Sequence, residues 1–96
     1  MSVSFPTTEA FKALARRIVW LEEPEESLSN IPRFLAYALR YAQPADMVAI
    51  REVLSDDYIL ETLDRLPPGI VDARSWAYWN SKLGRWPAPP PPQRQL

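Results

Sequence analysis

The chain has 96 residues, 11 basic and 12 acidic side chains for a net charge of −1, and neither cysteine nor histidine. A chain of this length forms one domain with a single modest core. Disulfides and thiolate metal sites are excluded, and so are triads built around imidazole, so we expect no catalytic, cofactor-binding or metal-binding residues.

Prolines divide the N-terminal third into expected elements. After Pro6, Thr7 or Thr8 can cap a first helix that ends near Trp20. Its apolar face, at helical spacing, comprises Phe11, Leu14, Ala15 and Ile18. The acidic segment EEPEESLSN, residues 22–30, is expected to be a loop, because proline is excluded from helix interiors and Ser and Asn favour turns.

Three helices are expected in the middle of the chain. Pro32 opens the second, whose apolar stripe comprises Phe34, Leu35, Ala38, Leu39 and Ala42. Pro44 begins the third, with an inner face of Met47, Ile50 and Leu54 and an outer face of Arg51 and Glu52. Ser55 caps the fourth, whose inner side comprises Ile59, Leu60, Leu63 and Leu66.

The acids of the fourth helix are interpreted structurally. Asp56 and Asp57 fall in its first turn, where negative charge complements the helix dipole. We prefer this explanation to the alternative that the two acids form half of a carboxylate metal site. A helix that reads DNA needs Arg, Lys, Asn or Gln facing the bases. This helix carries four acidic residues and only one basic residue, Arg65, so we do not expect it to read DNA.

The sequence LPPG at residues 66–69 predicts a turn, and Asp72 then caps a last helix over residues 73–83. Gly84 stands where a left-handed residue ends a helix. Beyond it, PAPPPP at residues 87–92 favours an extended polyproline arm, either free or serving as a docking peptide. The expected fold is all-α: a single small bundle of about five short helices over residues 1–86, followed by a proline-rich tail over residues 87–96.

The last quarter of the chain is basic and aromatic. After Asp72 there are four cations and no acid, and three of the four tryptophans lie within residues 72–86. Trp76 and Trp79 share one helical face and are expected in the core. Because Trp, Tyr and Arg are enriched in interface hot spots, the residues predicted to face a partner are Arg74, Tyr78, Arg85 and Trp86.

The longest apolar run covers residues 18–21, far short of the roughly 20 residues that a membrane span needs. The N-terminus has no signal-peptide pattern. We therefore expect a soluble cytoplasmic protein with no membrane partner, and the small net charge disfavours nucleic acid as its partner.

The chain from about residue 18 to residue 85 resembles a known family. The motifs are Trp20-Leu-Glu, PRFLAYALRYAQPADMVAIREVLSDDYILETL at residues 32–63 and SWAYWNSKLG at residues 75–84. They are similar to small helical bacterial proteins encoded beside AbiEii-like nucleotidyltransferase toxins and regarded as their antitoxins. None of the motifs is a catalytic signature. The amino-terminal helix and the proline arm lie outside the pattern.

The resemblance implies a non-enzymatic antitoxin that binds a nucleotidyltransferase toxin. It would cover the nucleotide or tRNA acceptor site, or displace the catalytic carboxylates and metal. Acidic side chains could imitate a triphosphate or a nucleic-acid backbone in a basic cleft, while the Trp/Arg end anchors elsewhere. These acids are Glu22, Glu23, Glu25 and Glu26.

Two other functions stay open. The basic C-terminal quarter could serve a nucleic-acid-binding autorepressor, and the proline arm could serve an adaptor recognised by an aromatic groove. The sequence also leaves open whether the protein forms a homodimer.

Overall fold

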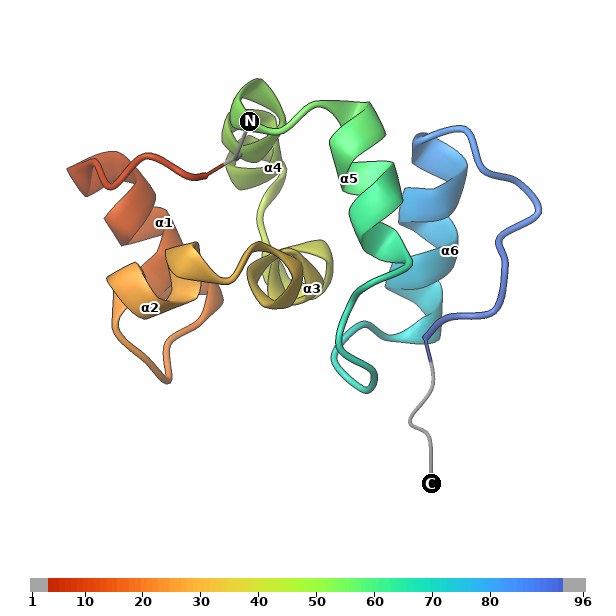
Figure 1. Ribbon diagram of the computed structural model, residues 1–96, viewed down its shortest axis with the longest axis horizontal. Coiled ribbons are helices and arrows are strands. Elements are labelled where there is room, and N and C mark those ends of the chain that lie inside the picture. The colour runs from red at the N-terminus through yellow and green to blue at the C-terminus, as the bar shows by residue number, and fades with distance from the viewer. Residues whose placement is uncertain (1–3, 93–96) are drawn as a thin grey trace.

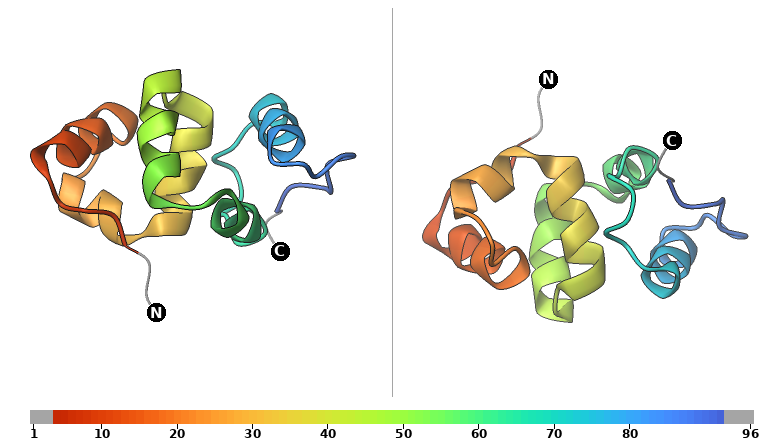
Figure 2. Two further views of the ribbon diagram at one scale, coloured as in Figure 1. Left: turned by 90° about the horizontal axis from the view of Figure 1, so that it is seen from above. Right: turned by 90° about the horizontal axis from the view of Figure 1, so that it is seen from below.

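The computed structural model describes residues 4–92, which contain six helices and no strand. The helices are α1 (Glu9–Ile18), α2 (Pro24–Ser29), α3 (Ile31–Tyr41), α4 (Pro44–Val53), α5 (Asp56–Leu63) and α6 (Ala73–Lys82). Along the longest axis they follow one another as the pairs α1/α2, α3/α4 and α5/α6 (Figures 1 and 2). The all-α prediction is confirmed, with one helix more than expected. Arg94 and the rest of the tail from residue 93 lie outside the described residues.

The additional helix is α2, so the prediction of a loop at residues 22–30 is wrong. Pro24 occupies the first position of the helix, where a backbone N–H would have no acceptor within the helix, so the proline breaks no hydrogen bond. The Ser27 hydroxyl lies 3.0 Å from Glu22 Oε1 and 3.4 Å from the Glu23 carbonyl oxygen, and Leu28 is buried. An early proline and one buried apolar side chain are enough for a helix of this length when neighbouring helices cover it.

Local signals place most of the other helix ends. The Thr8 hydroxyl accepts a hydrogen bond from the Phe11 N–H at 3.3 Å, and the Ser55 hydroxyl accepts one from the Tyr58 N–H at 3.1 Å. Gly84 has a φ of +89°, the left-handed conformation expected after the last helix. Asp72 is the N-cap residue of α6 but makes no capping hydrogen bond to the backbone. A hydrogen bond with the Ser75 side chain is the main reason that the pKa of Asp72 lies below its usual value.

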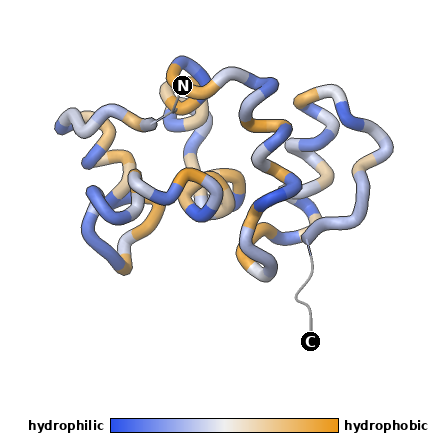
Figure 3. Tube along the Cα trace, viewed as in Figure 1, coloured by the Kyte–Doolittle hydropathy of each residue, from blue (hydrophilic) through white to orange (hydrophobic). Residues whose placement is uncertain are grey.

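The core is centred on α3, which contacts α1, α2, α5 and α6. Its buried residues are Ile31, Phe34, Leu35, Ala36, Ala38 and Leu39. Hydrophobic positions recur in every helix, so all six contribute to the same core (Figure 3). Complete burial of a large apolar side chain contributes about 1.5–3 kcal/mol, which makes these positions the main source of stability.

One buried polar contact joins the first helix to the fourth. Asp46 is only 6% exposed, and its Oδ1 accepts a hydrogen bond from Arg17 Nη2 at 2.5 Å. Its Oδ2 accepts one from the Gln43 N–H at 3.3 Å, as part of a capping box at the start of α4. Both carboxylate oxygens are thus satisfied, which offsets the cost of burying the charge.

Candidate protein-interaction surfaces

The residues predicted to face a partner fall into two groups. The acidic group belongs to α2 and the turn before it, and the aromatic and basic group belongs to α6 and the residues after it. The two groups lie at opposite ends of the long axis, with α3 and α4 between them (Figure 1). The structure therefore does not bring them together into one site.

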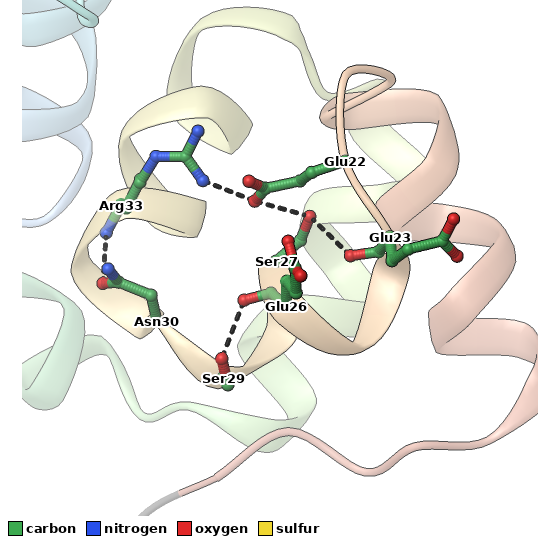
Figure 4. A network of polar contacts seen from close by, with 7 residues as sticks. All are labelled: Glu22, Glu23, Glu26, Ser27, Ser29, Asn30 and Arg33. Atoms are coloured by element: carbon green, nitrogen blue, oxygen red, sulfur yellow. Dashed lines mark hydrogen bonds and ion pairs between the residues drawn. The ribbon is translucent and has the colours of Figure 1, made fainter.

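Two of the four acids are engaged within the molecule. The Arg33 guanidinium donates a hydrogen bond to Glu22 Oε1, and this bond is the main reason that the pKa of Arg33 is raised (Figure 4). Glu25 lies 3.2 Å from Lys12 Nζ. The pKa of Glu25 is lowered, first by hydrogen bonding to its own backbone N–H and then by Lys12. Within residues 4–92, Glu23 and Glu26 are exposed and form no ion pair.

Arg85 is also engaged within the molecule. Its Nε donates to Asn80 Oδ1 at 2.6 Å, and its Nη1 lies 3.0 and 3.1 Å from the two carboxylate oxygens of Asp64. The guanidinium also lies 5.9 Å from the centroid of the Trp76 ring. Arg85 thus ties the end of α6 to the end of α5.

The tryptophans divide as the sequence predicts between core and surface. Trp76 is 4% exposed, and Trp79 is half-buried. Tyr78 and Trp86 are 55% and 70% exposed. The Trp76 indole N–H donates to the Pro89 carbonyl at 2.7 Å, so the described part of the proline arm lies against the helical body. Arg74, on the same helix, is exposed.

A groove runs between α4 and α6. It has a volume of about 330 Å³. Its lining residues are Ala42, Pro44, Met47, Val48, Arg51, Tyr78, Trp79 and Lys82. Most of this lining is apolar, and it also includes two cations, Arg51 and Lys82. Arg51 makes two hydrogen bonds to the Asp56 carboxylate, at 2.9 and 2.8 Å. Of the two cations that line the groove, only Lys82 forms no ion pair within residues 4–92.

A second aromatic surface was not predicted. We define the aromatic cluster as Trp20, Tyr37 and Tyr41 together with the neighbouring Leu21. The Trp20 and Tyr41 rings are 5.5 Å apart and those of Tyr37 and Tyr41 are 6.4 Å apart. The sequence did contain a signal for it: the two tyrosines are spaced i, i+4 outside the apolar stripe of α3, so they share one face at the edge of the core, against which Tyr37 packs.

Among residues 4–92, no three or more acidic side chains are grouped as ligands for a metal ion. None of the helices in this range is both long and apolar enough to cross a membrane. Comparison of the chain with protein-family models, curated proteins and solved structures finds no match.

Proposed function

We propose that this protein acts by binding and covering another macromolecule rather than by transforming a substrate. The observation that supports this proposal is that six large apolar side chains are exposed, although other residues already form the buried core. They are Trp20, Leu21, Tyr41, Val48, Tyr78 and Trp86. Exposed tryptophan and tyrosine side chains are typical of the few residues that dominate the energy of protein interfaces.

The partner that we propose is a nucleotidyltransferase-type toxin, as the sequence resemblance implies. The surface that fits this role best is the groove between α4 and α6 together with Trp86. Arg74, Tyr78 and Lys82 follow one another at four-residue spacing, so they form one strip along α6. This strip offers an aromatic anchor between two exposed cations, an arrangement suited to contacting the carboxylates of an active site while excluding water around them.

Co-expression with the neighbouring gene tests the proposal. We expect that gene to encode a nucleotidyltransferase that arrests growth when expressed alone and is harmless together with this chain. Replacing Tyr78 and Trp86 by alanine should weaken the purified complex by at least about 30-fold, the effect of losing one hot-spot residue. Glu61→Ala, at an exposed position of α5, is the matched control and should bind normally.

Three results would contradict the proposal or favour one of its alternatives. A neighbouring gene product that is neither toxic nor bound would remove the proposed partner. A gel shift that disappears with added salt would favour the autorepressor. Complete loss of binding on removing residues 87–96 would favour the adaptor, whereas occlusion by the helical body predicts only weakening.

The imitation of phosphates by acidic side chains is a separate part of the proposal. Only Glu23 and Glu26 can supply it without breaking an ion pair of the folded protein. Replacing these two residues by lysine should therefore reduce neutralisation while preserving the fold. If neutralisation were unchanged, we would abandon the mimicry, and occlusion through the α6 end would stand.

A further inference from the structure

The aromatic cluster lies outside the surface assigned to the toxin. We propose that it joins two copies of this chain into a dimer with twofold symmetry. In such a dimer the same patch is used on both copies, so the patch must be complementary to itself in shape and in charge.

The apolar part of the cluster contains two strongly exposed side chains. Leu21 and Trp20, in the turn after α1, are 75% and 60% exposed. Together with Val19 and Tyr37 they line a shallow apolar depression. A twofold arrangement lets the exposed Leu21 and Trp20 of each copy lie against the apolar surface of the other, which removes these side chains of both copies from water.

The charges around the cluster are arranged with opposite signs at its two ends. At one end, Glu22 is bonded to Arg33, whose guanidinium lies 5.3 Å from the Tyr37 ring centroid, and the exposed Glu23 follows in the chain. At the other end, the Arg40 guanidinium lies 5.0 Å from the Tyr41 ring centroid and donates a hydrogen bond to the Ile70 carbonyl at 3.1 Å, but it has no carboxylate partner among residues 4–92.

A twofold axis across the cluster places the acidic end of one copy against the basic end of the other. Glu23 would then face Arg40 of the second copy, twice in each dimer. The same acids disfavour nucleic acid here, because residues 22–26 carry four carboxylates that repel phosphate. The net charge of −1 means that two copies repel each other only weakly.

Sedimentation of the full chain alone, from about 1 to 500 µM, tests the proposal. We expect a concentration-dependent monomer–dimer equilibrium. Leu21→Asp should raise the dissociation constant by at least about 30-fold, because it buries two carboxylates in the apolar contact. Val48→Asp is the matched control: Val48 is 60% exposed on α4, outside the cluster, and should dimerise normally. Circular dichroism checks that both variants keep their helices.

A charge exchange tests the twofold arrangement itself. Glu23→Arg and Arg40→Glu each place like charges opposite one another at both ends, so each variant alone should be mainly monomeric. Mixing the two variants should restore the dimer, since one end then carries the original pair and the other end the inverted pair. Failure of the mixture to associate would overturn the twofold geometry. A wild-type chain that remains monomeric at every concentration would overturn the dimer.

These measurements need no toxin, so they succeed or fail independently of the proposed function. Binding of a different protein to the cluster of a monomeric chain would assign the surface to that protein and would contradict our proposal.

Discussion

The indole nitrogen of Trp76 makes the proline arm part of the folded body. A buried indole N–H needs an acceptor, and the Pro89 carbonyl supplies it at 2.7 Å. Ala88 packs against the core beside it. The residues of a proline run have no N–H of their own to donate, but their carbonyls are free to accept hydrogen bonds. One tryptophan therefore both closes the core and anchors the arm.

Replacing Trp76 by phenylalanine should lower the free energy of unfolding by about 1–3 kcal/mol, because it removes this hydrogen bond and part of a buried ring. Urea denaturation measures the change. Trp86→Phe is the control: Trp86 is 70% exposed, and its replacement should shift the free energy by no more than about 0.5 kcal/mol. Equal effects at the two positions would mean that the Pro89 contact contributes nothing.

Among the helices, α6 is ended by a glycine whose conformation other residues avoid. Gly84 has a φ of +89°, and a Cβ added there would meet no atom within 4 Å. A side chain at this position would therefore destabilise the protein through its unfavourable backbone conformation and not through steric clashes with other atoms.

Gly84→Ala should accordingly destabilise the protein by about 1–2 kcal/mol, the cost of a left-handed conformation for an L-residue. Thermal unfolding measures it. Gly84→Asn should cost less, because asparagine tolerates the left-handed region better than alanine does. If alanine and asparagine were equivalent, or if alanine were neutral, the backbone explanation would fail.

The pairing of Arg51 with Asp56 joins the end of α4 to the start of α5. The hydrogen bonds from Arg51 are the main reason that the pKa of Asp56 lies below its usual value. A carboxyl group whose pKa is lower in the folded state than in the unfolded state stabilises the fold above its unfolded pKa. This contribution is lost as the pH falls through the folded pKa.

Stability should therefore fall as the pH drops from about 5 to below 4, the region in which aspartate titrates. Asp56→Asn should make this fall shallower, because asparagine does not titrate. Urea denaturation at several pH values measures the change. Asp57→Asn is the neighbouring control, since Asp57 forms no ion pair among the described residues, and it should flatten the curve less. A steeper curve for Asp56→Asn would contradict the sign of the shift.

At the scale of the whole molecule, α3 connects the two ends of the core. It contacts helices on both sides, α1 and α2 at one end and α5 and α6 at the other. Neither end can keep its core when α3 is lost, so we expect one cooperative transition.

Leu35→Ala tests this expectation, since Leu35 is fully buried on α3. It should lower the free energy of unfolding by about 2–5 kcal/mol. The transitions followed by helical circular dichroism and by tryptophan fluorescence should shift together. Separate shifts would mean that the α1/α2 end and the α5/α6 end unfold independently. Val48→Ala, at an exposed position of α4, should leave both transitions nearly unchanged.

Much of the fold could be predicted because its signals act over a few residues. Thr8 and Ser55 cap helices through contacts three residues away, and Gly84 ends one through its own backbone. Helical spacing likewise placed Trp76 inside and Tyr78 outside. The acidic segment was predicted wrongly because Pro24 was read as a helix breaker rather than as the first residue of a helix.

The site was less predictable than the fold. Sequence spacing cannot tell which charges a folded chain pairs within itself, so Arg85 and Glu22 were predicted to face a partner although Asp64 and Arg33 engage them. These partners are 21 and 11 residues away in the chain. The cluster of Trp20 with Tyr41 joins the turn after α1 to the end of α3 and was missed for the same reason.

The sequence by itself thus determined the helical class, most helix ends, the inner faces and the division of Trp76 from Trp86. These features depend on backbone conformation and on periodicity, which neighbouring residues decide. Only the tertiary structure decided that the acidic and the aromatic ends lie apart, which charges remain unpaired, where the groove between α4 and α6 opens, and that the arm lies against α6. Those features depend on contacts between residues far apart in the chain, and such contacts exist only once the helices have packed around α3.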